Sequence, residues 1–311
     1  MPVLTETVRL FFTVGYLGDS FHGSQIQPDV VTVQGELIRA LTSLGWLDSA
    51  HSDRYLVLSS RTDAGVHVRL NGGIVDIDAA LWESLTPRKF VRAIDDRLRG
   101  DLCLLTVQEV EDDWNPRLAD YRVYRYRLEG MEFWQEPPLH QFEEWLKLFV
   151  GTKNVCNFAR VEPGKNPIRT VRSANPWTDN GRLIGFEIVG DSFLWNQVRR
   201  IANALFRLSV GEITVESIHD AFLHPEIEID FGVAPPEWLV LWGVSWERFP
   251  LPQSTSRVHF SAPPMGRQAE RTRKSRWQKA AQYELKSLLY HEWATLGILP
   301  NAYHSVDDEV E

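Results

Sequence analysis

The chain has 311 residues, 43% of them hydrophobic and 24% charged, which fits one large or two medium folded domains and excludes a disordered protein. Its net charge of −9 argues against binding nucleic acid by bulk charge, although phosphate contact needs only a local basic surface. The two distant cysteines, Cys103 and Cys156, argue against a disulfide framework or a cysteine-based metal site. No apolar run reaches membrane-span length and no secretion signal is recognisable, so we expect a cytoplasmic protein.

The first part of the chain predicts alternating strands and helices. Residues 8–15 are rich in β-branched and aromatic residues, which favours a strand, and a glycine-rich loop over 16–23 follows. Thr32 has the character of an N-cap, and the apolar residues from Val33 to Leu44 repeat at helical spacing. We also expect strands over 55–58 and 72–78 and a helix over 87–99.

Residues 120–129 alternate arginines with tyrosines and predict a strand. One interpretation is an ordinary half-buried strand with aromatic cross-strand pairs. The number of positive charges favours a surface that faces phosphate. The arginines concerned are Arg117, Arg122, Arg125 and Arg127.

A proline-containing break at 135–138 precedes a second α/β half. There we expect helices over 141–149 and 193–208 and strands over 170–176, 183–189 and 239–246. The predicted domains are an N-terminal α/β half (1–134), a C-terminal α/β half (135–248) and a linker with a basic amphipathic helical extension (249–311).

The C-terminal extension crowds basic residues into 267–279 and continues with apolar residues at helical spacing. This pattern predicts an amphipathic helix that docks on the body of the protein. The basic run either contacts phosphate or is a solvated helix face, and the sequence favours neither.

The most informative stretch is 60–67, Ser-Arg-Thr-Asp-Ala-Gly-Val-His. It places Asp63 on a loop after a short strand, a common position for catalytic groups. The guanidinium of Arg61 favours the ionised carboxylate, and Gly65 lets a substrate approach the backbone. On residue types alone, a polar turn is an equally good interpretation.

The stretch from Arg61 to His67 resembles the signature of the TruA family of tRNA pseudouridine synthases, and only Ser60 departs, where the family has glycine. The resemblance implies that Asp63 is the nucleophile. It also implies the pseudouridine synthase fold, an α+β fold in which two α/β halves with antiparallel sheets join around a central active-site cleft.

Three other stretches resemble family motifs. The loop and helix start over 16–34 resemble the first motif, which approaches RNA. Tyr124 corresponds to the tyrosine that lies over the target base and can accept a proton, and Arg199 to the arginine that pairs with the aspartate. The resemblance implies substrate binding by Tyr16, Gln25, Gln27, Arg61, His67, Arg122, Leu194 and Val198.

The closing motif departs from the family, because Trp238 stands where glycine is usual. A tryptophan at this place can reshape the pocket wall near Leu239 and so alter substrate choice.

The resemblance implies an isomerase that converts uridine to pseudouridine in the anticodon arm of tRNA, at positions 38, 39 and/or 40. It further implies a homodimer that takes tRNA as its partner and uses no cofactor or metal. The sequence contains no P-loop, dinucleotide fingerprint or His/Cys metal spacing. It leaves open whether Asp63 attacks C1′, attacks C6 or acts as a base.

Two other functions are compatible with the sequence. A glycosidase needs a second carboxylate, which Asp191 or Glu36 could supply if the fold brought either one close to Asp63. A non-catalytic tRNA-binding module on the same fold would bind tRNA and leave its uridines unmodified.

Overall fold

The computed structural model describes residues 6–47, 56–254, 258–263 and 270–298, and for residues 270–273 and 298 it describes the backbone alone. None of the described helices combines the length and the apolar character that crossing a membrane requires.

The chain forms two compact units, each built from segments that are distant in the sequence. Residues 121–134, which the sequence division places in the first half, belong to unit 2, and the C-terminal extension contributes to both units. The division at 134 and 248 stays a prediction about independently folding domains. Unit 1 comprises Met1–Asp120, Gly243–Ser256 and Leu289–Glu311, and unit 2 comprises Tyr121–Trp242 and Arg257–Leu288.

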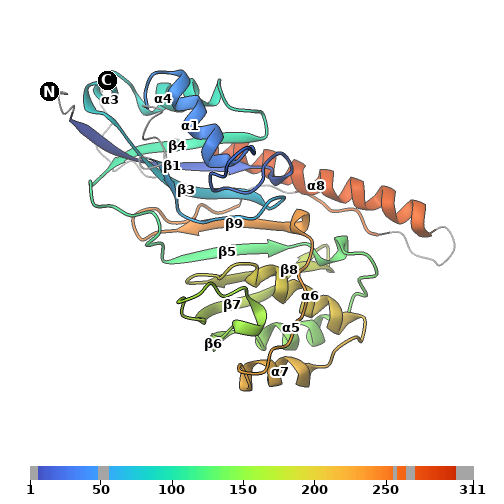
Figure 1. Ribbon diagram of the computed structural model, residues 1–311. Helices are drawn as coiled ribbons and strands as arrows, with labels where there is room; N and C mark the ends of the chain where they lie inside the picture. Colours follow the sequence, from blue (N-terminus) through green and yellow to red (C-terminus); the bar gives the residue numbers. More distant parts are fainter. Residues whose placement is uncertain (1–5, 48–55, 255–257, 264–269, 299–311) are drawn as a thin grey trace. The chain divides into compact units, whose positions relative to one another are not determined.

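Unit 1 is built on an antiparallel sheet, whose strands are β1 (Thr7–Tyr16), β2 (Leu56–Leu58), β3 (His67–Asp78) and β4 (Leu102–Val110). Their order is β4-β1-β3 (Figure 1). Strand β2 also pairs with β3. The helices of this unit are the 3-10 turn η1 (Gly18–Ser20), α1 (Val33–Ser43), α3 (Ala79–Glu83) and α4 (Pro87–Asp95). Helix α4 packs against β4, and α1 contacts α4 and β2. The N-cap prediction is confirmed, because Thr32 Oγ1 accepts a hydrogen bond from the N–H of Gly35 at 3.2 Å.

An aromatic cluster fills one side of the unit 1 sheet around Phe11. Its ring lies 4.4 Å from that of Phe249, 4.8 Å from that of Trp114 and 5.1 Å from that of Trp246, measured between centroids. A Cβ at Gly72 would lie 2.4 Å from the Trp246 ring, so glycine on β3 makes room for the cluster.

Unit 2 contains antiparallel strands in the order β5-β8-β7-β6 (Figure 1). Its strands are β5 (Tyr121–Tyr126), β6 (Gly151–Asn154), β7 (Ile168–Asp179) and β8 (Arg182–Gly190). Its helices are α5 (Leu139–Lys147), α6 (Gln197–Ser209) and α7 (Val215–Leu223), with the 3-10 turns η2 (Leu128–Gly130), η3 (Cys156–Phe158) and η4 (Pro236–Trp238). Strand β9 (Leu239–Ser245) and helix α8 (Glu270–Ile298) each contribute residues to both units.

The predicted α+β class with antiparallel sheets is confirmed, but several element boundaries were wrong, and two of these have a clear physical reason. The strand expected over 120–129 ends at Tyr126, because Arg127 turns into a buried polar network. The helix expected from residue 193 begins at Gln197, because Asn196 has a left-handed φ of 62° and interrupts the helical path. Strands β4 and β6 and helices α3 and α7 were not predicted.

Helix α8 docks through the expected apolar stripe. Its buried side chains recur at helical spacing and include Trp277, Ala281, Leu285, Leu288, Leu289, Trp293 and Leu296. These buried residues follow the apolar spacing read from the sequence, while the description of 249–311 as a separate extension stays a prediction.

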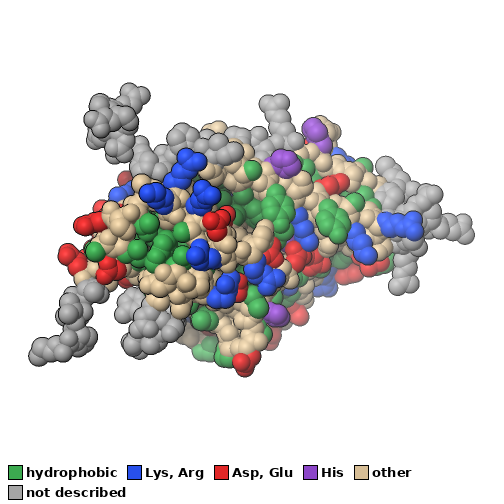
Figure 2. Space-filling view, turned by 90° about the horizontal axis from the view of Figure 1, so that it is seen from above, with side chains coloured by type: hydrophobic (Ala, Val, Ile, Leu, Met, Phe, Trp, Pro, Cys, Tyr) green, Lys and Arg blue, Asp and Glu red, His purple; other side chains and the backbone are tan. Residues whose placement is uncertain are grey.

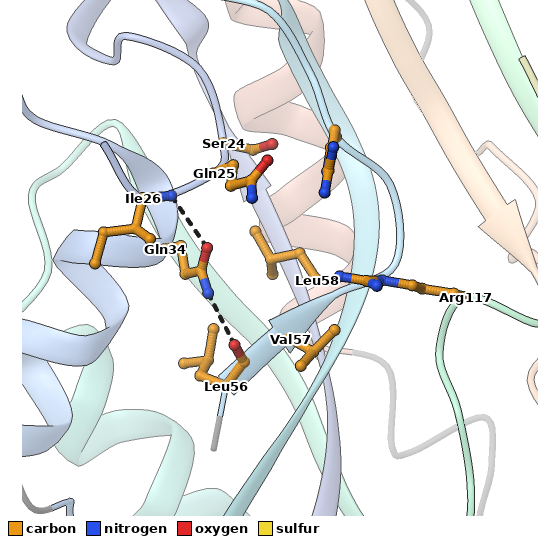
Figure 3. Close-up of a pocket in the computed structure, with 9 residues that line it drawn as sticks. Ser24, Gln25, Ile26, Gln34, Leu56, Val57, Leu58 and Arg117 are labelled. Carbon is orange, nitrogen blue, oxygen red and sulfur yellow. Dashed lines mark hydrogen bonds between the residues drawn. The ribbon is translucent and has the colours of Figure 1, made fainter. Parts of the chain in front are cut away.

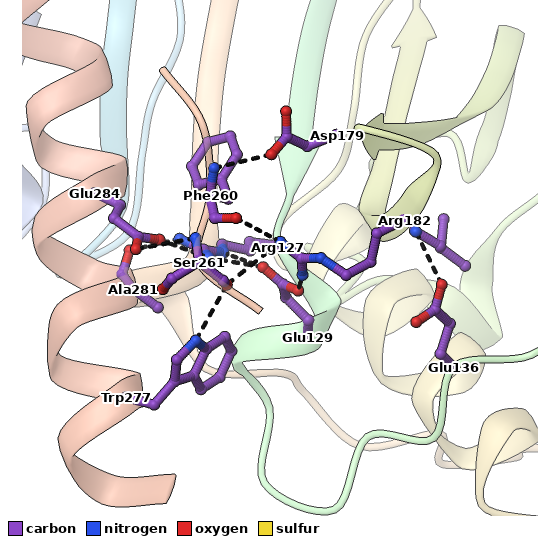
Figure 4. A network of polar contacts seen from close by, with 11 residues as sticks. Arg127, Glu129, Glu136, Asp179, Arg182, Phe260, Ser261, Trp277, Ala281 and Glu284 are labelled. Carbon is purple, nitrogen blue, oxygen red and sulfur yellow. Dashed lines mark hydrogen bonds and ion pairs between the residues drawn. The ribbon is translucent and has the colours of Figure 1, made fainter. Parts of the chain in front are cut away.

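A buried arginine holds the unit 2 part of α8 (Figure 4). Arg127 is 0% exposed and donates to Ala281 O at 2.6 Å, to Glu129 Oε1 at 2.8 Å and to Glu284 Oε2 at 2.9 Å. Burial lowers the pKa of Arg127, and the hydrogen bond to Glu284 opposes that shift. The interpretation of Arg127 as a phosphate-facing residue is wrong, because its charge is satisfied inside the protein.

A second buried ion pair holds the unit 1 part of α8. Arg69 Nε donates to Glu292 Oε2 at 2.6 Å, and the two side chains are 0% and 1% exposed. The same helix turn places the Trp293 indole N–H on the Arg69 carbonyl at 2.9 Å. A Cβ at Gly15 would lie 2.1 Å from that indole nitrogen, so Gly15 makes room for the helix.

Replacement of Glu292 by alanine should destabilise the protein by roughly 3–5 kcal/mol, because it leaves the buried Arg69 charge without its partner. The double variant Arg69→Met/Glu292→Met should lose much less, since it removes both charges. Urea unfolding of both variants measures the difference. Equal stability of Glu292→Ala and the unmodified protein would show that the pair contributes nothing.

Candidate functional site

The loop that carries Asp63 packs backbone to backbone against the glycine-rich loop of unit 1. A Cβ at Gly18 would lie 2.4 Å from both the carbonyl carbon of Gly65 and the carbonyl oxygen of Val66. The Gly65 N–H donates to Gly18 O at 3.3 Å. Gly65 has a φ of 82°, a conformation that other residues rarely adopt. Glycines at 18 and 65 therefore allow the two loops to touch.

Thr62, the residue before Asp63, is held by three hydrogen bonds. Its N–H donates to Ser24 Oγ at 2.9 Å, and its carbonyl accepts from the Ser24 N–H at 3.1 Å. Its hydroxyl bonds to Tyr16 OH at 2.8 Å. The Asp63 carbonyl accepts from the Val66 N–H at 3.2 Å and closes the turn, while the Asp63 side chain is only half-buried. The loop therefore presents one carboxylate from a rigid base.

Three of the predicted substrate-binding residues in this unit make supporting contacts. His67 is 1% exposed, and its Nδ1 accepts from the Gly18 N–H at 3.0 Å. Gln27 Nε2 donates to His22 O at 2.7 Å and closes the glycine-rich loop. Tyr16 is 1% exposed beneath Thr62. Contact of these residues with a substrate stays a prediction.

Two other predicted binding residues, Gln25 and Arg61, line one cavity of about 170 Å³ in unit 1. Gln34 shapes its wall, since its side-chain amide accepts from the Ile26 N–H at 3.1 Å and donates to Leu56 O at 2.9 Å. Figure 3 shows the Arg117 side chain reaching toward this cavity. The remaining lining residues are Ser24, Val57 and Leu58.

In unit 2, strand β5 supports the loop over 191–196. Arg122 Nη1 donates to the Asp191 carbonyl at 2.5 Å. Tyr124 is 8% exposed, and its ring lies edge-on to Phe193 with centroids 5.2 Å apart. The predicted pocket residues follow along the chain, with Leu194 half-buried in the loop and Val198 buried in α6.

Arg199 is tied to the closing segment of unit 2 by reciprocal hydrogen bonds. Its Nε donates to Ala234 O at 2.7 Å, and its carbonyl accepts from the Ala234 N–H at 3.1 Å. The neighbouring Pro235 carbonyl accepts from Tyr126 OH at 2.9 Å. Burial, with a smaller contribution from Glu237, raises the pKa of Tyr126 well above its ordinary value, so this hydroxyl remains a donor.

The other carboxylates considered from the sequence are engaged within their own units. Asp191 pairs with Arg172 at 2.5 Å in unit 2, and Glu36 pairs with Arg39 at 2.9 Å in unit 1. Among the residues that the structure describes, no group of three His, Cys, Asp or Glu side chains is arranged to hold a metal ion.

Comparison with known proteins assigns the family. A family model described as tRNA pseudouridine synthase matches residues 146–247. The tRNA pseudouridine synthase A of Thermococcus onnurineus is 37% identical over 241 residues, covering 77% of this chain and 85% of that protein. The enzyme of the same name from Methanosarcina barkeri is 35% identical with the same coverage.

The chain belongs to the tRNA pseudouridine synthase A family. This is a family of isomerases, and the TruA resemblance and the pseudouridine synthase fold expected from the sequence are confirmed. Among solved structures, a Cbf5-Nop10-Gar1 complex aligns at 12% identity with a TM-score of 0.33, covering 64% of this chain and 44% of that one. A likeness at that level adds no argument about function.

The structure explains why this family member tolerates Ser60 in place of glycine. Asn71 is 0% exposed, and its side chain accepts from the Ser60 N–H at 3.2 Å and donates to the Ser60 carbonyl at 2.8 Å. Ser60 is not among the described residues with positive φ, so the position does not require glycine. Asn71 and Ser24 are supporting residues that the sequence reasoning missed, because neither carries a recognisable pattern.

The second departure from the family, Trp238, is a packing residue. It is 3% exposed, and its ring covers Gly130, where a Cβ would lie 2.4 Å from the indole. The neighbouring Arg127 N–H donates to the Trp238 carbonyl at 3.0 Å. The tryptophan therefore fills space above a glycine of the same unit.

The arginines expected on a phosphate-facing strand are not all available for that role. Arg125 pairs with Glu187 at 2.8 Å and stacks on Trp242 at 3.8 Å. On the face shown in Figure 2, basic side chains lie in small groups interspersed with acidic ones. The negative total charge therefore coexists with local basic groups.

Replacement of Ser24 by alanine should weaken the support of the loop that carries Asp63, because the part-buried Thr62 N–H loses its acceptor. We expect a loss of stability of about 1–3 kcal/mol and a lower kcat for pseudouridine formation. Ser43→Ala is the control, since Ser43 Oγ donates to Ala40 O at 2.7 Å on α1, outside these loops. An unchanged kcat in Ser24→Ala would show that this contact does not position Asp63.

Proposed function

We propose that this protein isomerises uridine to pseudouridine in tRNA, at positions 38, 39 and/or 40 of the anticodon arm. The observation that carries the proposal is Asp63, which lies in the family signature on a loop fixed through Thr62. The relatives named tRNA pseudouridine synthase A support tRNA as the substrate. The choice of these nucleotides follows from the motif resemblance.

The reaction rearranges one nucleotide without net oxidation or reduction. The C1′–N1 bond breaks, the uracil turns, and a C1′–C5 bond forms while C5 loses a proton and N1 gains one. Asp63 supplies the carboxylate, and attack at C1′, attack at C6 and proton removal all remain open as its first step. The atoms balance with no co-reactant.

The roles proposed for the remaining site residues rest on the resemblance to the family motifs. Tyr124 supports the extruded base with its ring, and its hydroxyl is available to take the C5 proton. Arg199 pairs with Asp63 and orients its carboxylate. Leu194 and Val198 exclude water from the uracil, and Arg61 and Gln25 bind the RNA next to the catalytic loop.

We also propose that the protein acts in the cytoplasm as a homodimer. Two acidic copies, each with small basic groups, would then bind one tRNA together. Sedimentation of the protein with and without tRNA measures this, and a monomer in both conditions contradicts it.

The direct test is to incubate the purified protein with a tRNA transcript and map pseudouridine at each position. Modification at 38, 39 or 40 supports the proposal, and modification elsewhere overturns the positional part alone. Tight binding without modification would favour the non-catalytic tRNA-binding module. Release of free uracil would favour the glycosidase.

Replacement of Asp63 by asparagine should lower kcat by at least about a thousandfold while tRNA binding persists, because the amide keeps the shape but is neither nucleophile nor base. Glu36→Gln is the control, since it removes one of the two carboxylates that could serve as the second acid of a glycosidase, and it should leave turnover unchanged. Pseudouridine formation by Asp63→Asn at a near-normal rate would refute the assignment.

Tyr124→Phe and Tyr124→Leu separate stacking from proton transfer. If the ring alone matters, phenylalanine should be nearly silent and leucine slow, because only leucine removes the aromatic face. If the hydroxyl takes the C5 proton, phenylalanine should bind tRNA normally and turn over very slowly. Single-turnover rates distinguish these cases, and full activity of the leucine variant would contradict both.

A further inference from the structure

Trp195 is a large aromatic residue in a fixed but exposed position on unit 2. It is 45% exposed, which is unusual for a tryptophan. Its carbonyl accepts from the Arg160 N–H at 2.8 Å. The turn around it is closed by Gln197, whose N–H donates to Leu194 O at 3.0 Å and whose side chain accepts from the Leu194 N–H at 2.9 Å. The backbone is therefore held while the ring faces solvent.

Arg160 adds a cation to this ring. Its guanidinium lies 4.2 Å from the centroid of Trp195, and the residue is exposed. Within the part of the chain that the structure describes, no carboxylate forms an ion pair with Arg160. The pair thus presents an aromatic face beside a positive charge that no described carboxylate neutralises.

The start of the loop over 191–196 also places arginines next to an aromatic ring. Asp191 is bonded by Arg122 and Arg172, and the Arg172 guanidinium lies 5.4 Å from the Tyr121 ring. Arginines interleaved with aromatic rings are typical of surfaces that bind unpaired nucleic acid. A protein-docking surface would instead present a broad apolar patch, and charged groups flank Trp195 here.

We propose that Trp195 and Arg160 form a stacking site for an unpaired nucleotide of the RNA substrate. The base packs on the indole, and the guanidinium contacts the adjacent phosphate. This inference rests on the proposed function. The site is separate in role from Tyr124, which is 8% exposed and packs against Phe193.

The test measures the dissociation constant for a tRNA transcript, kcat at saturating tRNA, and the melting temperature. Trp195→Ala should weaken tRNA binding roughly tenfold, because a base loses its stacking partner. It should leave kcat and the melting temperature unchanged. Trp195→Phe should retain most of the affinity. Arg160→Gln should weaken binding and reduce the slope of log affinity against log salt by about one.

Two variants serve as matched controls. Tyr283 is another exposed aromatic residue with a cation over its ring, Lys286 at 5.8 Å, so Tyr283→Ala removes a similar pair elsewhere in unit 2. Lys147→Gln removes one exposed positive charge from α5. Neither should change tRNA affinity beyond twofold.

Unchanged tRNA affinity in Trp195→Ala overturns the inference. A lower kcat with unchanged affinity also overturns it, because Trp195 would then position the loop. If sedimentation shows a changed oligomeric state of Trp195→Ala while its tRNA affinity is unchanged, Trp195 belongs to a protein interface and the inference is also overturned. Because the dissociation constant can be measured with each change placed in the Asp63→Asn protein, which should bind tRNA without turnover, the stacking site can fail or succeed independently of pseudouridine formation.

Discussion

The contact between two backbone loops of unit 1 is the constraint on which the position of Asp63 depends. Gly18 and Gly65 lack side chains where the loops meet, and any Cβ at Gly18 would collide with backbone atoms. Ser24 and Tyr16 each form a hydrogen bond with Thr62, the residue before Asp63. The Asp63 side chain on this loop is half-buried, so part of it is accessible to a substrate.

Two buried arginines form ion pairs with glutamates of helix α8. Arg127 within unit 2 and Arg69 within unit 1 are each fully buried and each bonded to a glutamate of α8. Breaking such a pair is costly, because the remaining charge is left in a medium of low dielectric constant. Several arginines of an acidic chain therefore serve packing, and those left at the surface are the candidates for RNA contact. In the basic run over 267–279, the structure describes the side chains of Lys274, Arg276 and Lys279. Arg267 lies outside the described residues, and the side chains of Arg271 and Arg273 are not described.

The loop over 191–196 has a hydrogen-bonded backbone and an exposed Trp195 side chain. Its backbone is bonded to β5 through Arg122 and to the segment around Arg160, while the turn before α6 places Trp195 at the surface. Asn196, with a left-handed φ of 62°, follows Trp195 directly and marks the start of α6, which is shorter than the helix that the sequence predicted.

The sequence by itself determined the family signature from Arg61 to His67, the N-cap at Thr32 and the apolar stripe of α8, because each is a pattern of residue types at short range. Only the tertiary structure decided that Arg127 is buried, that Ser24 supports Thr62 and that Trp238 covers Gly130. Those contacts join residues far apart in the chain. Which side chain meets which depends on how the whole unit folds, and no local period or spacing encodes it.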